Sequence, residues 1–134
     1  MSAEKPSEVT IRTLAMPSDT NPSGDIFGGW VMSQMDLAAG ICAGQRAMRR
    51  VVTVAVDAMS FIQPVQVGDV LCVYTQVVSV GRTSMTILVE AWARRDRIGE
   101  RVKVTQAHFK FVALDDDGKP TPIPALDPHQ STGC

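Results

Sequence analysis

The sequence predicts an α+β domain in which one long helix packs against an antiparallel sheet that curls around it. The prediction rests on a single convincing helix, residues 28–47, and on later segments rich in Val, Ile, Thr and aromatic residues. A chain of 134 residues can bury one core but is too short for two domains, and a hydrophobic content of 45% excludes a disordered chain. We therefore expect a single domain over residues 1–134, with loose tails at residues 1–8 and about 121–134.

The first elements in chain order are a strand, a loop and the helix. Residues 9–16 have the composition of a strand, and residues 17–25 are dense in Pro, Ser, Asp, Asn and Gly, which favour a loop. Gly28 and Gly29 then open the helix. Basic side chains suit its C-terminus, where the negative end of the helix dipole lies: Arg46, Arg49 and Arg50.

Four strands are expected after the helix, at residues 51–56, 69–80, 83–95 and 101–114. In the third of these, apolar residues alternate with polar ones, so one of its faces meets the core. One sheet covers only one side of a helix, yet this helix is apolar almost all round. We therefore expect a second copy of the chain to cover the rest of the helix.

Asp36 is the leading candidate for a catalytic group, because residues 27–45 carry no other charge. No Lys or Arg lies three or four residues away to pair with it. Its face of the helix holds only small side chains: Gly29, Ser33, Gly40, Ala43 and Ala47. We expect a buried carboxylate in a tight cleft, whose pKa is raised or whose partner lies across an interface. The alternative is an ordinary solvated helical Asp.

The overall charge excludes two classes of partner. With 13 Lys plus Arg and 14 Asp plus Glu, the formal net charge is -1, which supplies no field to draw the protein to nucleic acid or to an anionic membrane. The N-terminal residues lack the apolar core of a signal peptide, and no run approaches the roughly 20 apolar residues of a membrane span. We therefore expect a cytoplasmic protein. Cysteines without a CxxC spacing and only two histidines predict no metal site.

The stretch from Leu14 to Asp36, LAMPSDTNPSGDIFGGWVMSQMD, closely resembles the signature of the hotdog-fold acyl-CoA thioesterases of the YciA type. The likeness continues through VVTVAV, FIQPVQVGD and VGRTS, and covers nearly everything from residue 12 to residue 120. The resemblance implies hydrolysis of acyl-CoA thioesters to free acid and CoA, with broad acyl tolerance and no cofactor. It also implies a homo-oligomer, in which dimers share one continuous sheet, three dimers form a hexamer, and active sites lie between subunits.

By position, Asp36 matches the family's catalytic acid, and the backbone of Gly28 and Gly29 matches its carbonyl-polarising turn. Attack on a thioester builds negative charge on the carbonyl oxygen, and N–H groups at a helix N-terminus are aimed to receive it. Asp36 can activate water as a general base, or attack the carbonyl itself and form an anhydride, and the sequence does not choose between these routes. Asn21 is a further catalytic candidate and Asp25 a substrate-binding one, although both residue types also suit a turn.

The phosphates of coenzyme A require local positive charge on a protein with this net charge. One turn offers a guanidinium, hydroxyls and exposed N–H groups, and the resemblance places it near the nucleotide: Gly81, Arg82, Thr83 and Ser84. A second basic group surrounds Gly99: Arg94, Arg95, Arg97, Arg101 and Lys103. Ser60 is another candidate for substrate contact, with Asp57 in the same ambiguous position near the end of a strand.

Three functions are compatible with the sequence. The leading one is acyl-CoA thioester hydrolysis. The second is a hotdog module that binds acyl-CoA without turning it over, which the acid on an apolar helix argues against. The third is a hydratase or dehydratase on the same fold, whose chemistry needs a His paired with an acid in the cleft. His108 is expected on the polar face of its strand, exposed to solvent, and so is poorly placed for that chemistry.

Overall fold

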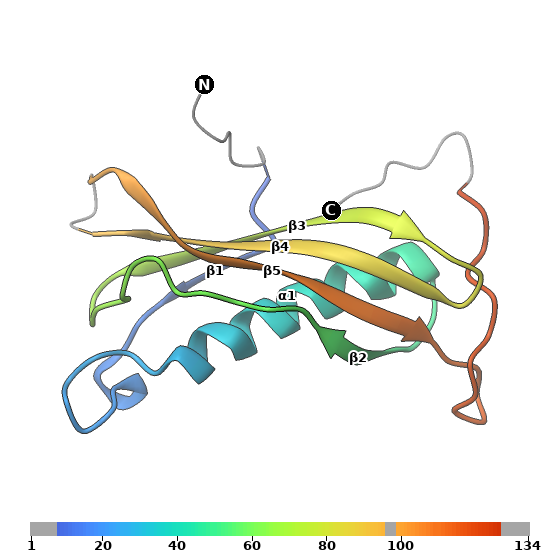
Figure 1. Ribbon diagram of the computed structural model, residues 1–134, viewed down its shortest axis with the longest axis horizontal. Coiled ribbons are helices and arrows are strands. Elements are labelled where there is room, and N and C mark those ends of the chain that lie inside the picture. The colour runs from blue at the N-terminus through green and yellow to red at the C-terminus, as the bar shows by residue number, and fades with distance from the viewer. Residues whose placement is uncertain (1–7, 96–98, 127–134) are drawn as a thin grey trace.

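The computed structural model describes residues 8–95 and 99–126. In this part of the chain, one helix of 20 residues, α1 (Gly28–Ala47), runs along one face of a five-stranded antiparallel sheet (Figure 1). The strands are β1 (Ile11–Leu14), β2 (Val51–Val56), β3 (Val70–Val80), β4 (Ser84–Arg94) and β5 (Arg101–Ala113), and a short 3-10 helix, η1, spans Pro17–Asp19. The predicted α+β class and the bounds of the predicted helix are confirmed.

The strand order across the sheet is β1-β3-β4-β5-β2. Consecutive strands β3, β4 and β5 pair along most of their length and form the centre, whereas β1 and β2 are the two edges. The first strand is shorter than residues 9–16, although Thr10 N–H donates to Val73 O at 2.9 Å and Ala15 N–H to Asp69 O at 2.9 Å, so hydrogen bonding continues beyond both ends. β2 pairs with β5 alone and leaves its outer edge unpaired in the single chain.

The core lies between α1 and the sheet. The predicted inward face of β4 is confirmed, because its alternating residues are all buried: Met85, Ile87, Val89, Ala91 and Ala93. Small side chains on the facing side of α1 let the helix lie close to the strands: Ala38, Ala39 and Ala43. Met48 adopts a left-handed conformation with φ 58° directly after α1, and its N–H donates to Gly44 O at 2.8 Å, which ends the helix.

The opposite side of α1 is left uncovered, as predicted. Leu37 and Ile41 are 58% and 46% exposed. The edge strand β2 adds an exposed valine row of its own: Val52, Val54 and Val56. A single chain therefore presents an apolar helix face together with an unpaired apolar strand, a combination typical of a surface that another chain covers. Within residues 8–95 and 99–126, the structure contains no helix with the length and apolarity needed to cross a membrane.

Residues 121–124, assigned to a loose tail from the sequence, are hydrogen-bonded to the domain. Thr121 N–H donates to Ala113 O at 2.9 Å, and Ile123 N–H donates to Arg82 O at 2.8 Å. Arg46 Nη1 donates to the carbonyl oxygen of Pro124 at 2.8 Å. This segment therefore joins the end of β5 to the turn after β3 and to the last turn of α1. The remainder of the two predicted tails, residues 1–7 and 127–134, lies outside the described residues.

Candidate active site

The carboxylate of Asp36 is held by a side chain from β2. Thr53 Oγ1 donates a hydrogen bond to Asp36 Oδ1 over 2.6 Å. Thr53 is opposite Phe111 in the register between β2 and β5, and Phe111 is buried against α1, so Thr53 projects toward the helix. The bond fixes one oxygen of Asp36 and leaves the second oxygen available to a substrate or a water molecule.

Asp36 is not buried in the single chain, which differs from the expectation of a tight cleft. Its side chain is exposed, and of the small residues expected on its face, Ala43 and Ala47 turn toward the core while Gly29 and Ser33 are exposed. The difference arises because the sheet covers one side of α1 and Asp36 lies on the other. Burial of this carboxylate therefore requires a second chain on the uncovered helix face.

The glycine turn at the start of α1 presents two N–H groups without acceptors. Phe27 O accepts from Trp30 N–H at 3.1 Å and from Val31 N–H at 3.4 Å. Gly28 and Gly29 precede these donors in the first turn of the helix, and no acceptor for either N–H occurs in the two described stretches of the chain. Both glycines are exposed. Their N–H groups, at the positive end of the helix dipole, form a ready site for a developing oxyanion.

Phe61 closes one side of this turn. A Cβ atom at Gly28 would lie 3.4 Å from the Phe61 ring, whereas nothing lies within 4 Å of one at Gly29. Phe61 reaches this position because its neighbour Ile62 is tied to β5, where Ile62 N–H donates to Val104 O at 2.7 Å. The glycine turn thus lies near the start of β5 and near the end of β4 with which it pairs.

Asp36 and the glycine turn of the same chain lie far apart along α1. They are separated by two helical turns, about 12 Å along the helix axis. A base, a water molecule, a carbonyl group and an N–H donor in hydrogen-bond contact span less than this, since each hydrogen bond is about 3 Å long. If both groups serve one thioester, they must come from two chains.

Asn21 shapes the loop before α1. Its Oδ1 accepts from Ser23 N–H at 2.9 Å and from Asp25 N–H at 3.1 Å, and its own N–H donates to Asp25 O at 2.7 Å. This is the turn role that the sequence analysis kept as the alternative for both residues. The side-chain amide of Asn21 makes no hydrogen bond within residues 8–95 and 99–126, so it remains free to donate toward a ligand.

The turn that carries Arg82 lies at the other end of the molecule, beside the C-terminus of α1. Gly81 N–H donates to Ser84 O at 2.7 Å and closes the turn, and Thr83 O accepts from Ala113 N–H at 2.9 Å. The guanidinium side chain of Arg82 is exposed, while Thr83 and Ser84 are half-buried.

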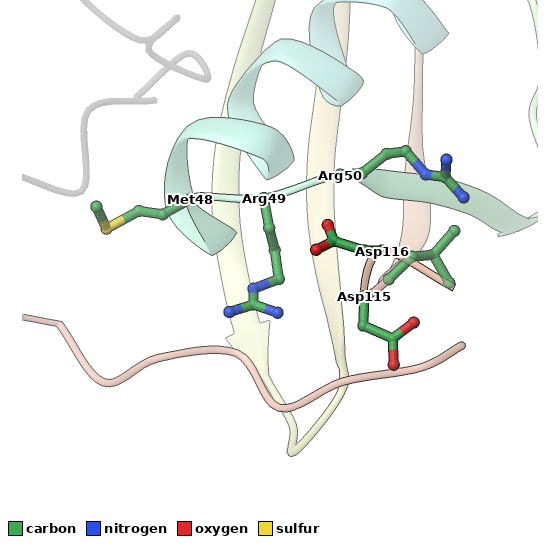
Figure 2. A pocket seen from close by; sticks show the side chains of 6 residues that line it. Met48, Arg49, Arg50, Asp115 and Asp116 are labelled. Atoms are coloured by element: carbon green, nitrogen blue, oxygen red, sulfur yellow. The ribbon is translucent and has the colours of Figure 1, made fainter. Parts of the chain in front are cut away.

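A pocket of about 500 Å³ adjoins this turn. Figure 2 shows Met48, Arg49 and Arg50 spreading from the end of α1, with Asp115 and Asp116 across the pocket from them. Leu114 completes the lining, and its N–H donates to Arg50 O at 2.8 Å. The pocket thus brings together Arg49 and Arg50, which were predicted at the helix C-terminus, about 18 Å along the helix axis from Asp36.

Ser60 lies in a different cavity, of about 450 Å³, whose wall also includes Asp57, Lys103 and His108. His108 Nδ1 lies 2.8 Å from Asp57 Oδ2, and His108 N–H donates to Asp57 Oδ1 at 2.8 Å. These backbone and side-chain hydrogen bonds lower the pKa of Asp57 below its ordinary value of 3.8. His108 is half-exposed but paired with an acid, not merely solvated as expected.

The Asp57 and His108 pair is separated from Asp36 by the sheet. Ala107 and Phe109, on either side of His108 in β5, are buried in the core against α1. The alternation of a strand therefore directs His108 to the outer face, away from α1. The described residues contain no cluster of His, Cys, Asp or Glu suited to a metal ion. A single chain thus offers two separate groups of polar side chains, one on each face of the sheet.

The basic group around Gly99 is divided by the fold. Arg95 Nε lies 3.2 Å from Asp69 Oδ2, and Arg95 Nη2 donates to Pro64 O at 2.6 Å. Lys103 Nζ lies 3.3 Å from Glu90 Oε1 and donates to the side-chain oxygen of Gln106. Both cations are therefore engaged within the domain. Arg97 lies outside the described residues, which leaves Arg94 and Arg101 of the predicted group.

Two contacts at the site were not found from the sequence. Thr53 is the only polar residue in the strand VVTVAV, and that was the available signal for its role beside Asp36. The packing of Phe61 on the glycine turn depends on a loop path that no local pattern encodes.

Comparison with known proteins identifies the family. Residues 23–100 match the family model described as the thioesterase superfamily. The chain is 53% identical over 120 residues to the acyl-CoA thioester hydrolase YciA of Salmonella typhimurium, covering 87% of this chain and 90% of that protein.

Solved structures agree with the sequence match. The crystal structure of HI0827, a hexameric broad specificity acyl-coenzyme A thioesterase, superimposes with a TM-score of 0.86 at 52% identity and covers 92% of this chain and 85% of its own. The hexameric thioesterase y2039 from Yersinia pestis has a TM-score of 0.86 at 51% identity and covers 90% of this chain and 99% of its own. Cj0915, a hexameric hotdog fold thioesterase of Campylobacter jejuni, has a TM-score of 0.82 at 45% identity and covers 88% of this chain and 91% of its own. The hotdog fold predicted from the sequence is thereby confirmed, and the chain belongs to the thioesterase superfamily.

Proposed function

We propose that this protein hydrolyses acyl-CoA thioesters to free acids and CoA, accepts a broad range of acyl chains, and uses Asp36 as its catalytic carboxylate. The observation that carries the proposal is the Asp36 carboxylate, fixed by Thr53 at 2.6 Å on the uncovered side of α1 with its second oxygen free. Relatives at about half identity are acyl-CoA thioester hydrolases, and HI0827 is a broad specificity acyl-CoA thioesterase.

The Asp36 carboxylate and the glycine turn carry out different parts of the reaction. Asp36 takes a proton from the attacking water, or its free oxygen attacks the thioester carbon and forms an anhydride that water then opens. In both routes the carbonyl oxygen gains negative charge, which the unbonded N–H groups of Gly28 and Gly29 stabilise. The thiolate of CoA leaves readily, so the reaction needs no strong general acid. Asn21 contributes its free side-chain amide beside the glycine turn.

Each active site is assembled from two chains. Asp36 of one chain and the glycine turn of its partner meet when two α1 helices pack with their uncovered faces together and in opposite directions. Three features support this arrangement: the separation of about 12 Å within one chain, the exposed apolar face of α1, and the unpaired β2 edge. The similar thioesterases HI0827 and y2039 are hexameric, and we propose a homohexamer built as a trimer of dimers.

The nucleotide end of CoA binds to charged turns. Arg82 is exposed on the turn from Gly81 to Ser84, next to the pocket that Arg49 and Arg50 line. An extended pantetheine arm spans the distance of about 18 Å between this pocket and Asp36. Asp25 and Ser60 remain proposed substrate contacts, with Ser60 supported by its place in the cavity beside Lys103. We also retain the cytoplasm as the proposed location, because acyl-CoA substrates are formed there.

A panel of acyl-CoAs incubated with the pure protein tests the proposal. We expect free thiol to appear with acyl chains of several lengths. A binding module without catalysis would bind acyl-CoA and release no thiol, and a hydratase would change the enoyl absorbance of an unsaturated acyl-CoA while the thiol stays esterified. Either of these two results would contradict the proposed hydrolase.

A further inference from the structure

Three arginines converge on the outer face of the sheet, away from α1. Arg94 of β4 and Arg101 of β5 are direct partners in the strand register. Arg12 lies on β1, opposite Cys72 of β3. Cys72 is in turn opposite Trp92 of β4, and Trp92 lies two residues before Arg94 on the same face of the sheet. The row across the strands that contains Arg12 is therefore next to the row that contains Arg94 and Arg101.

Within residues 8–95 and 99–126, no acidic side chain lies within ion-pair distance of this group. The ion pairs in the described part of the chain involve Arg95, Lys103 and His108, and none involves Arg12, Arg94 or Arg101. Arg94 and Arg101 are like charges directly opposite each other on adjacent strands, an arrangement that destabilises a sheet. The domain therefore holds uncompensated positive charge at one point, although its net charge is close to zero.

Tyr74 supplies a buried polar group that contacts one of the three arginines. Its side chain is 2% exposed, and its hydroxyl oxygen accepts a hydrogen bond from Arg101 Nη1 at 2.5 Å. Burial raises the pKa of this hydroxyl and Cys72 adds to the rise, while the guanidinium groups of Arg101, Arg12 and Arg94 oppose it. Of the three arginines, Arg101 contacts this oxygen directly. The hydroxyl stays protonated and has its own proton to donate.

Two hydrogen-bond donors of the arginine group have no acceptor. The Nε atoms of Arg94 and Arg101 are buried and have no acceptor. A buried donor without an acceptor costs free energy, and so does an unpaired pair of like charges. A bound anion would offset both costs, because it supplies acceptor oxygens and opposite charge at the same place.

We propose that Arg12, Arg94, Arg101 and Tyr74 form a binding site for a phosphate group. A guanidinium is planar, remains charged and matches two phosphate oxygens at once, and the Tyr74 hydroxyl adds a donor. The site is distinct from the Arg82 turn, which lies at the opposite end of β4.

Two sources can supply the phosphate. Arg101 shortly precedes Val104 in β5, and Val104 O accepts a hydrogen bond from Ile62 N–H. Ile62 follows Phe61, whose ring packs against the glycine turn. A CoA whose thioester lies at this glycine turn would then bring its nucleotide phosphates to the outer face in place of the Arg82 turn, and that version rests on the proposed function and is an alternative to its Arg82 contact. The other source is a free phosphorylated compound that binds independently of the substrate.

Pyrophosphate is the probe, and its binding to the intact protein is measured by titration calorimetry. We expect the dissociation constant to rise about tenfold or more in Arg94→Gln and in Arg101→Gln, because each loses a charge-assisted contact. Tyr74→Phe should weaken binding by a smaller factor. Lys110→Gln is the matched control, since it removes a positive charge from an exposed position elsewhere on the sheet and should bind as the wild type does.

Equal affinity in the wild type and in Arg94→Gln would overturn the phosphate site. The melting temperature without pyrophosphate provides a check on folding, and Arg94→Gln should not lower it, because the like-charge pair is removed. Light scattering provides a second check. If the wild type does not bind pyrophosphate and Arg94→Gln changes the oligomer mass, these arginines contact another subunit, which also overturns the proposal.

Kinetics then distinguish the two sources. If the phosphate belongs to CoA, Arg101→Gln raises KM for an acyl-CoA but not for the acyl-pantetheine thioester, and pyrophosphate competes with acyl-CoA alone. If a free phosphorylated compound binds, KM is unchanged while pyrophosphate binding is lost. The titration needs no turnover, so a failure of the proposed hydrolase would leave this test of the phosphate site intact.

Discussion

At the scale of single residues, the role of Asp36 depends on its carboxylate and on one hydroxyl. The isosteric variant Asp36→Asn keeps the volume of the side chain and loses the base. We expect its kcat to fall about 100-fold or more, with the melting temperature close to the wild-type value because the Asn amide oxygen can still accept the hydrogen bond from Thr53. Thiol release by purified wild type and variant measures this, and retention of more than about a tenth of the wild-type turnover would remove Asp36 from the mechanism.

Thr53 is predicted to position Asp36 without touching the substrate. Thr53→Val removes the hydroxyl that donates to Asp36 Oδ1 at 2.6 Å, and we expect kcat to fall about tenfold while KM stays close to the wild-type value. Thr53→Ser retains the hydroxyl and should restore most of the rate. A structural role would instead lower the melting temperature of Thr53→Val without this recovery of kcat in Thr53→Ser.

At the scale of elements, one substitution tests the role of the turn after β3 and another tests the segment after β2. The Arg82 side chain is exposed, and the turn is held by backbone hydrogen bonds that its replacement leaves in place. Arg82→Gln should therefore raise KM for acyl-CoA about tenfold with a smaller change in kcat. The increase in KM should be absent for acyl-pantetheine thioesters. An equal increase in KM for both substrates would show that Arg82 does not contact the nucleotide.

The segment after β2 is fastened to β5 through Asp57 and His108. Because the pKa of Asp57 is lowered in the folded chain, its contribution to stability is present above its ordinary pKa of 3.8 and is lost as the pH falls through the folded value. Asp57→Asn should therefore lower the urea midpoint at about pH 6, and this loss should shrink progressively as the pH falls below 3.8. A loss that stays the same below pH 3.8 would show that the charge of Asp57 does not stabilise the fold.

At the scale of the whole molecule, local patterns in the sequence predicted most of the architecture. The period of the helix and the alternation in β4 specified which residues meet the core, and the apolar excess on α1 predicted the face left uncovered. The contacts between distant segments were not predictable in this way. Thr53 reaches Asp36, and Arg101 reaches Tyr74, only because the sheet order brings β2 beside β5 and places β3 and β5 on the two sides of β4. The exposure of Asp36 reflects the same limit, since its proposed cover comes from another chain.

The central claim is an active site shared by two chains, and subunit mixing tests it directly. Gly28 is the first residue of α1 and follows Phe27 at φ -59° and ψ 134°, a backbone that accepts proline at the next position. Gly28→Pro therefore removes one N–H group with little change to the helix, and Gly28→Ala, which keeps that N–H, is the matched control. We expect Gly28→Pro to be nearly inactive and Gly28→Ala to be active.

In the decisive measurement, equal amounts of inactive Asp36→Asn and inactive Gly28→Pro subunits are exchanged, and thiol release is recorded once mass spectrometry shows mixed dimers. In a mixed dimer, one site carries both lesions and the other carries none. Random mixing makes half of the dimers mixed, so activity should return to about a quarter of the wild-type value. No recovery after verified exchange would place Asp36 and the glycine turn in the same chain's site and contradict the shared active site.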